Sequence, residues 1–161
     1  MEANMKSDKD EKGAEVKFPP PLIFIFSLFF AYGVHYFYPI KIGVSYEVKY
    51  VGVVIVLLAL GLIIYISRIF KRVATNIEPW KPTTTIITTG IYAYSRNPIY
   101  VAFCLVPIGV GIILNSFWLL CSFLPSALIV YFVAIRKEET YLEQNFGTEY
   151  QQYKKRVRRW L

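Results

Sequence analysis

The chain has 161 residues, enough for one domain. They are 55% apolar or aromatic and only 18% charged, a composition that excludes a disordered chain. The apolar surface of such a chain also exceeds what a soluble domain of this size can bury. The net charge of +7 does not indicate a nucleic-acid partner, because the basic residues flank apolar segments, as at a membrane surface. Both cysteines, Cys104 and Cys121, lie in apolar runs, so we expect neither a disulfide framework nor a metal site.

Residues 1–17 form a polar stretch that is predicted to be a disordered cytoplasmic tail, and 18–161 are predicted to form a single membrane domain. Four apolar runs occupy most of that domain. A helix that crosses the bilayer core needs about 20 mainly apolar residues. The sequence therefore predicts an all-α integral membrane protein with four transmembrane helices, at about 22–39, 50–67, 98–114 and 117–135.

The distribution of Lys and Arg predicts the orientation of these spans. With four spans, both ends of the chain and the long loop over 68–97 share one side of the membrane. All but two of the 18 basic residues lie on that side, the exceptions being Lys41 and Lys49. The positive-inside rule then places both termini in the cytoplasm. We expect a multi-pass protein of a bacterial or archaeal plasma membrane.

Residues 138–160 are predicted to form an amphipathic helix at the membrane interface. Its apolar and aromatic residues recur at three- and four-residue steps: Tyr141, Leu142, Phe146, Tyr150, Tyr153, Val157 and Trp160. Gly147 lowers the helix propensity and is a candidate break. Two interpretations are open at this point: the helix is a basic membrane anchor, or it covers a binding site.

Two polar stretches, 88–100 and 136–150, contain more charged and hydrogen-bonding side chains than membrane anchoring needs. Both lie where the third and fourth helices are expected to meet the cytoplasm. Because the tight turn at Asn115-Ser116 makes those helices a hairpin, we expect the two stretches to be close in space. Together they offer the guanidinium of Arg96 and the carboxylates of Glu138 and Glu139, which predicts a binding site there.

These stretches resemble the membrane-embedded methyltransferases, the group that includes isoprenylcysteine carboxyl methyltransferases and phospholipid N-methyltransferases. The resemblance covers roughly residues 50–161. It rests on one motif with Gly90, Tyr92, Arg96, Asn97, Pro98 and Tyr100, and on a second with Glu138, Glu139, Leu142, Phe146, Gly147, Tyr150 and Tyr153. Many members carry His where this chain has Asn97, and the isoprenylcysteine enzymes usually have more helices.

The resemblance implies a multi-helix membrane fold that binds S-adenosylmethionine on the cytoplasmic side. It also implies which residues line or shape the cofactor site: Gly90, Tyr92, Asn97, Pro98, Tyr100, Glu138 and Glu139. We expect a lipidic or prenylated small acceptor within the membrane, with no nucleic-acid partner. The oligomeric state is left open.

Arg96 and Glu139 are the predicted catalytic residues. Arg96 is the only guanidinium in the motif, and a guanidinium holds a carboxylate with two hydrogen bonds. Glu138 and Glu139 point about 100° apart on a helix, so only one is expected to face the site, and Glu139 is preferred. Carboxylate, amine and thiol acceptors are all compatible with the sequence.

The expected reaction is methyl transfer like that of the isoprenylcysteine carboxyl O-methyltransferases. Three alternatives are open: a phospholipid N-methyltransferase, a sterol-type reductase that uses a nicotinamide cofactor, and a non-catalytic membrane subunit that retains the fold. The reductases are much longer than this chain. Binding of S-adenosylmethionine, of NADPH or of neither would separate these alternatives.

Overall fold

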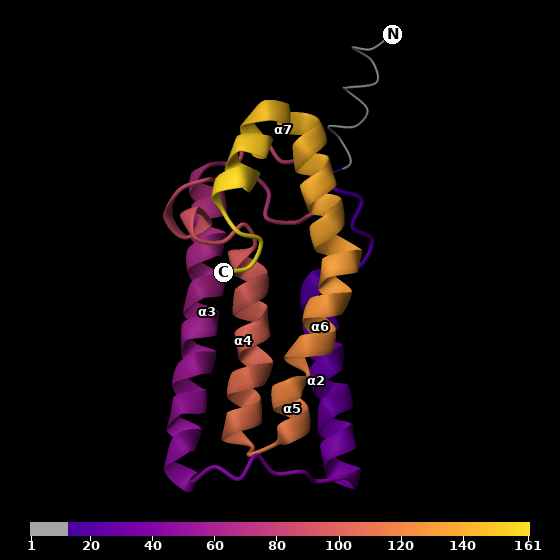
Figure 1. Cartoon of the computed structure of the whole chain (residues 1–161), viewed down its shortest axis with the longest axis vertical. Coiled ribbons are helices and arrows are strands. Elements are labelled where there is room, and N and C mark those ends of the chain that lie inside the picture. The colour runs from indigo at the N-terminus through magenta and orange to yellow at the C-terminus, as the bar shows by residue number, and fades with distance from the viewer. Residues whose placement is uncertain (1–12) are drawn as a thin grey trace. The chain divides into compact units, whose positions relative to one another are not determined.

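The computed structural model describes residues 13–161, and the regular structure of that range is helical, without a named strand. The helices of the described range are α2 Pro20–Phe37, α3 Lys49–Arg72, α4 Pro98–Ile113, α5 Phe117–Cys121, α6 Phe123–Val130 and α7 Arg136–Arg156. Two short 3₁₀ turns, η1 Tyr46–Val48 and η2 Gly90–Ala93, precede α3 and α4. A π-helical turn, η3 Tyr131–Ile135, joins α6 to α7 (Figure 1). The predicted all-α class is confirmed.

Three helical stretches are long and apolar enough to cross a membrane: Pro20–Phe37, Tyr46–Arg72 and Phe117–Arg156. They indicate a multi-pass membrane protein. The helix α4 has 16 residues, which at about 1.5 Å per residue falls short of a bilayer core about 30 Å thick. Four complete spans, and the orientation of both termini, therefore stay predictions.

The described residues divide into two compact units, each built from segments that are distant in the sequence. Unit 1 contains residues 13–18, Ile66–Pro98 and Tyr131–Leu161, and unit 2 contains Pro19–Tyr65 and Ile99–Val130. The single domain predicted over 18–161 stays a prediction.

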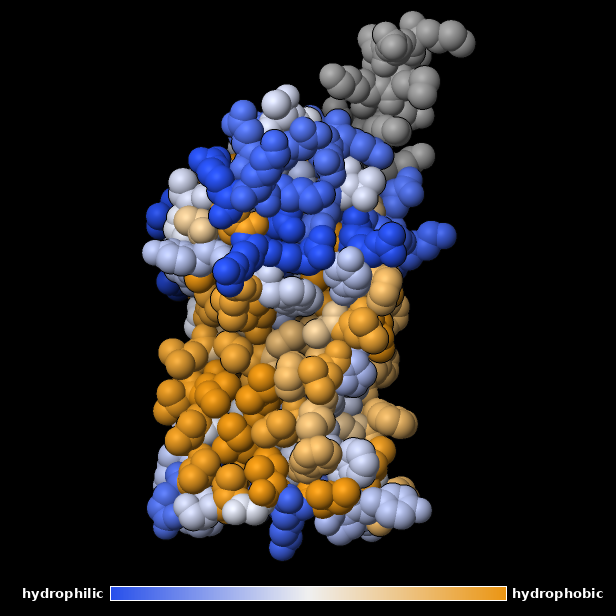
Figure 2. Space-filling model, in the orientation of Figure 1, coloured by the Kyte–Doolittle hydropathy of each residue, from blue (hydrophilic) through white to orange (hydrophobic). Residues whose placement is uncertain are grey.

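Unit 2 presents large apolar side chains on its surface. Phe29 and Phe30 of α2 are exposed, as are Leu57 and Leu58 of α3. Figure 2 shows apolar residues covering the visible face of these helices. In water such a surface would favour aggregation, whereas lipid tails solvate it, so this unit has the surface expected of a membrane-embedded helix group.

The helices α3 and α4 approach closely within unit 2 because glycines face each other. A Cβ atom added at Gly52 would lie 2.7 Å from the carbonyl oxygen of Gly109, and one added at Gly109 would lie 2.7 Å from Cγ2 of Val56. Without a strong hydrophobic force between helices in lipid, close van der Waals packing of small residues is what holds them together. Gly52 and Gly109 are the small residues that allow this contact.

We predict that Gly52→Ala lowers the thermal unfolding temperature of the detergent-purified protein. The added methyl group displaces α4, and overpacking of this kind costs about 1–3 kcal/mol, more than the gain in helix propensity of about 1 kcal/mol. Gly61→Ala, on the same helix, is the matched control, because a Cβ there meets nothing within 4 Å in the described part of the chain. Equal unfolding temperatures for both variants would contradict the packing assigned to Gly52.

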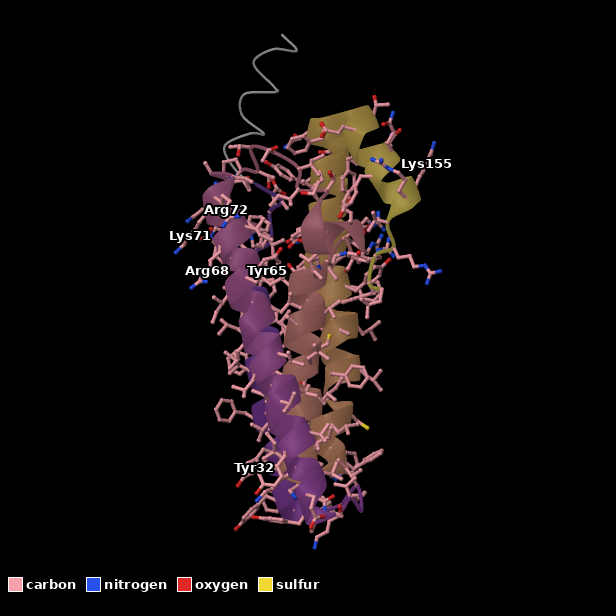
Figure 3. The ribbon with its side chains drawn as sticks, turned by 90° about the vertical axis from the view of Figure 1, so that its left-hand side faces the viewer. Tyr32, Tyr65, Arg68, Lys71, Arg72 and Lys155 are labelled. Carbon is pink, nitrogen blue, oxygen red and sulfur yellow. The ribbon has the colours of Figure 1, made fainter. Side chains whose placement is uncertain are left out.

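Unit 1 is hydrophilic on the face drawn in Figure 2 and contains the long loop after α3. At the end of α3, Arg68, Lys71 and Arg72 are exposed and point outward (Figure 3). The loop is fixed by side chains: Nδ2 of Asn76 donates to the carbonyl of Pro82 at 2.8 Å, and the Thr83 amide donates to the hydroxyl of Tyr141 at 3.0 Å.

The disorder predicted for residues 1–17 is wrong for residues 14–17. The Ala14 amide donates to the carbonyl of Pro79 at 2.7 Å, and Val16 is buried. Nζ of Lys137 donates to the carbonyl of Glu15 at 3.3 Å. Two small apolar residues within a polar stretch were sufficient to anchor it on the loop. Residues 1–12 of the predicted tail lie outside the described residues.

The amphipathic helix predicted over 138–160 is observed as α7, which begins at Arg136 and ends at Arg156. It bends at Gly147, whose φ of 50° and ψ of −118° are not helical, so the predicted break is confirmed. The prediction that the helix continues to 160 is wrong, because Val157 has extended backbone. The aromatic stripe faces the interior of unit 1, where Tyr141, Tyr150 and Tyr153 are buried. Its placement at a membrane interface stays a prediction.

Candidate functional site

The first motif lies on an irregular segment that ends in a helix. Gly90 has a φ of +62°, a conformation that glycine adopts without strain, and begins the 3₁₀ turn η2. Oγ of Ser95 accepts the amide of Asn97 at 3.2 Å, which closes a local turn. Pro98 is the first residue of α4, where its missing N–H is no disadvantage. The backbone thus places Arg96 just before the helix.

Arg96 and Glu139, which lie on the two polar stretches that were expected to be close in space, form an ion pair. Nη2 of Arg96 lies 3.1 Å from Oε1 of Glu139, and both side chains are almost completely buried. A second arginine, Arg159, binds the same carboxylate with two hydrogen bonds, Nε to Oε1 at 2.9 Å and Nη2 to Oε2 at 2.8 Å. We call Arg96, Glu139 and Arg159 the arginine–glutamate cluster.

The segment that follows α7 returns across the first motif. The Arg96 amide donates to the carbonyl of Arg158 at 3.0 Å, and Nδ2 of Asn97 donates to the carbonyl of Arg159 at 3.0 Å. Oγ of Ser95 is 3.5 Å from the same Arg159 oxygen. Figure 1 shows the chain turning back after α7 to end beside the residues that precede α4. These contacts support the interpretation that the C-terminal region covers a site.

Tyrosines form the wall beside the cluster. The hydroxyl of Tyr153 donates to the carbonyl of Tyr92 at 2.7 Å, and the Tyr92 ring lies 6.0 Å from that of Phe70. Burial, with smaller contributions from Tyr153 and the Glu138 carboxylate, raises the pKa of Tyr92. Burial also raises the pKa of Tyr153, to about 12. Both phenols therefore remain protonated at neutral pH and act as neutral hydrogen-bonding groups.

The cluster carries two positive charges and one negative charge. Nε and Nη1 of Arg96 are buried and have no hydrogen-bond partner among residues 13–161. Buried polar groups are nearly always paired, so two unpaired donors on a charged group indicate a ligand. The N–H bonds of Nε and Nη1 lie on different edges of the guanidinium, so each can donate to a separate acceptor oxygen of an anionic ligand. The cluster therefore has the charge and the donors to bind an anionic carboxylate.

The structure brings most of the predicted site residues together in unit 1. Arg96 and Glu139 are in direct contact, Asn97 holds the backbone of Arg159, and Gly90 and Pro98 shape the segment between them. Glu138 is half-buried on the same helix as Glu139. Arg96 and Arg159 both bind Glu139, and which of the two carboxylates faces a cofactor stays a prediction.

Tyr100, which is also predicted to bind cofactor, belongs to unit 2. It is buried there, with its ring centroid 6.4 Å from that of Phe103. Its role toward the cofactor stays a prediction.

Arg159 was missed by the sequence reasoning, which counted it only among the basic residues of the C-terminal end. No local pattern distinguishes it from Arg158 or Arg156. A helical projection fails here, because the chain leaves the helical conformation at Val157. The sequence offered no signal for it, because the helix predicted over 138–160 includes position 159.

Comparison with known proteins identifies the group to which this arrangement belongs. Residues 48–149 match the phospholipid methyltransferase family, over more than half of the chain. The chain belongs to the phospholipid methyltransferase family. The predicted resemblance is confirmed, and the matched residues of the family include Arg96 and Glu139 but end before Arg159.

Two curated relatives match shorter parts of the chain. The chain is 39% identical over 74 residues to a protein-S-isoprenylcysteine O-methyltransferase of Schizosaccharomyces pombe, a match that covers 45% of the chain and 30% of the relative. It is 67% identical over 27 residues to an uncharacterized protein of Haemophilus influenzae, covering 17% of the chain and 43% of that protein. The chain thus spans less than half the length of either relative within these matches.

A solved structure resembles this family member in fold. It is that of a eukaryotic intramembrane Ras methyltransferase, isoprenylcysteine carboxyl methyltransferase, with a TM-score of 0.63 and 24% sequence identity. The match covers 84% of the chain and 49% of the solved protein. At this identity the likeness shows a common membrane fold.

Proposed function

We propose that the protein transfers a methyl group from S-adenosylmethionine to the carboxylate of a lipidic or small amphipathic acceptor, as a prenylated cysteine would offer. One observation carries the choice of acceptor: Arg96 keeps two buried donors unpaired, among the described residues, in a cluster with an excess of one positive charge. The family and the isoprenylcysteine methyltransferase relative support methyl transfer as the reaction.

The residues of unit 1 fit a cofactor of this kind. S-adenosylmethionine has a carboxylate, an ammonium group, ribose hydroxyls and a sulfonium, so it needs both anionic and neutral partners. The half-buried carboxylate of Glu138 and the protonated phenol of Tyr92 suit its cationic and hydroxyl groups. Both oxygens of Glu139 are held by arginines, so the direct cofactor contact expected of Glu139 stays a prediction. When bound, the cofactor supplies an electrophilic methyl group.

In this proposal the residues of the chain position the acceptor and exclude water. Arg96 orients the acceptor carboxylate through a hydrogen bond from one of its open donors, Nε or Nη1. A carboxylate is already a nucleophile, so no side chain has to remove a proton. Correct positioning alone is worth about 7–11 kcal/mol of the barrier. The segment after α7 and the wall of tyrosines shield the cluster, which strengthens its electrostatic interactions.

Asn97 fits a carboxylate acceptor. An amide has no titration in the physiological range, so Asn97 cannot exchange a proton with the acceptor as a histidine could. Its Nδ2 instead donates to the carbonyl of Arg159. We infer that Asn97 anchors the segment after α7, a role that requires a donor and no proton transfer.

An amine acceptor is the second candidate, because the family that matches is named for phospholipid methylation. A protonated amine would be repelled by the two guanidiniums that share Glu139, and it must lose a proton before it reacts. A carboxylate meets neither obstacle. The charge of the arginine–glutamate cluster therefore favours the carboxylate.

The test is transfer of labelled methyl from S-adenosylmethionine to a lipid extract or to N-acetyl-S-farnesylcysteine, using the purified full chain. We expect a product whose label is released as methanol by mild base, which identifies a methyl ester. Label in a base-stable product would indicate N-methylation and contradict the carboxylate assignment. No transfer to either acceptor, with no binding of S-adenosylmethionine, would indicate a non-catalytic subunit.

We further propose that the site faces the cytoplasm, because basic side chains at the end of α3 and in α7 suit the anionic inner leaflet. The prediction concerns single cysteines placed in a chain that lacks Cys104 and Cys121. A cysteine at Ser45 should react with an impermeant thiol reagent in intact cells, and one at Thr84 only after permeabilisation. Both positions are exposed, so the reverse pattern would contradict the orientation.

A further inference from the structure

The arginine–glutamate cluster has an arrangement that needs an explanation. A buried carboxylate lies 3.1 Å from Nη2 of Arg96, yet it does not engage Nε or Nη1 of the same guanidinium. Arginine and carboxylate usually pair through two parallel hydrogen bonds, which is the stronger geometry. Here Glu139 makes that two-bond pair with Arg159 instead, at 2.9 and 2.8 Å.

We propose that Arg159 is a positioning residue that occupies Glu139 and thereby keeps Nε of Arg96 open for an oxygen of a ligand carboxylate. The inference rests on the proposed function for its ligand, but the residue has no assigned role in that function. Without Arg159, the carboxylate of Glu139 is free to rotate and capture Arg96 in a two-bond pair. The anion site would then be closed by the protein's own side chain.

Three contacts hold Arg159 in place for this role. Its guanidinium lies over the ring of Tyr131, 5.1 Å from the centroid, and its own carbonyl accepts Nδ2 of Asn97. The neighbouring carbonyl of Arg158 accepts the Arg96 amide. Arg159 is therefore anchored by its backbone to the segment that carries Arg96 and by its side chain to the helix that carries Glu139.

The π-helical turn η3 places Tyr131 for this contact. In a regular α-helix, residues eight apart such as Tyr131 and Glu139 lie about 80° out of register around the axis. A π turn has more residues per turn, so it lowers the rotation per residue and brings the two side chains towards one face. Arg159 contacts both Tyr131 and Glu139, so the π turn places its two partners on the same side of the helix.

The positive charge of Arg159 also favours binding of an anionic ligand. Its pKa is raised, chiefly by the hydrogen bond to Glu139, so it is charged at all physiological pH values. Loss of its charge leaves Arg96 and Glu139 as a neutral pair. The cluster would then lose both the open donors and the excess positive charge that attract an anion.

The experiment measures the affinity of the purified full chain for N-acetyl-S-farnesylcysteine, for its methyl ester and for S-adenosylhomocysteine. For Arg159→Ala we expect affinity for a carboxylate ligand to fall by at least about tenfold, as for loss of a charge-assisted hydrogen bond. Affinity for the methyl ester, which lacks the anion, should change little. Arg158→Ala is the matched control, because it removes the same charge from an exposed neighbour and keeps the backbone contact.

Chemical rescue separates positioning from a general loss of structure. The Arg159 side chain is 34% exposed, so a small solute can reach its place. Ethylguanidinium, which has the same fork, should restore binding of the acid to Arg159→Ala. Ethylammonium at the same concentration should not, because it offers a point charge and no fork. Arg159→Lys provides a second variant with conserved charge, and we expect weaker binding of the acid than in the parent.

Five outcomes are informative. A fall with the prenylated acid assigns the carboxylate to the acceptor, and a fall with S-adenosylhomocysteine assigns it to the cofactor, so either supports the role of Arg159. Unchanged binding of both ligands by Arg159→Ala and Arg159→Lys overturns it. An equal loss for the acid and the methyl ester, without rescue, also overturns it, because it shows a merely structural role. A parent that binds these ligands but transfers no methyl refutes the proposed function alone.

Discussion

Arg96→Lys should lower methyl transfer to a carboxylate acceptor at least about tenfold, equivalent to about 1.4 kcal/mol of transition-state stabilisation. Lysine keeps the positive charge and can still contact Glu139, but it lacks the additional donors, Nε and Nη1, that Arg96 keeps open while Nη2 contacts Glu139. The measurement is kcat/KM with N-acetyl-S-farnesylcysteine, alongside calorimetric binding of S-adenosylhomocysteine, which should change little.

Arg158→Lys is the control for this prediction, since Arg158 is an exposed arginine in the segment that covers the motif. It should retain the parent's kcat/KM. The clamp on the acceptor carboxylate would be refuted if Arg96→Lys weakened cofactor binding as much as turnover. In that case the carboxylate held by Arg96 belongs to the cofactor.

Glu139→Gln should destabilise the protein by about 3 kcal/mol, at the lower end of the range for breaking a buried ion pair, because Arg159 is partly exposed. The substitution leaves the nearly buried guanidinium of Arg96 beside a neutral amide. The measurement is the thermal unfolding temperature in detergent. Binding of S-adenosylhomocysteine should fall more for this variant than for Glu138→Gln, as expected if Glu139 organises the site.

The matched control is Glu143→Gln on the same helix. Glu143 pairs with Lys154 at 3.2 Å, but both side chains are 39% exposed, and such surface pairs contribute only about 0–1 kcal/mol. Glu143→Gln should therefore unfold close to the parent. Equal unfolding temperatures for the two variants would show that the arginine–glutamate cluster does not stabilise unit 1.

The parts of the fold that follow from local physics were predictable from the sequence. Long uncharged runs predicted the helices, and Gly147 predicted the bend in α7, because glycine alone adopts its backbone angles without strain. The proximity of the two stretches that carry Arg96 and Glu139 was expected from a helical hairpin. These are consequences of composition and spacing, which a linear sequence displays directly.

The remaining features depend on tertiary contacts. Arg159 reaches Glu139 because the chain becomes extended at Val157 and turns back, and nothing in the local sequence encodes that direction. The π turn at Tyr131–Ile135 has no compositional signal within an apolar run. Residues 14–17 are ordered by the carbonyl of Pro79 and by Lys137, both distant in the sequence. A helical projection of residues 157–160 could not have placed Arg159.

The most direct test of the central claim is an experimental structure of the full chain with N-acetyl-S-farnesylcysteine and S-adenosylhomocysteine bound. The account predicts that the acceptor carboxylate accepts a hydrogen bond from Nε of Arg96, while Glu139 remains in its two-bond pair with Arg159. An acceptor carboxylate held elsewhere, with Glu139 engaging Nε and Nη2 of Arg96, would contradict it.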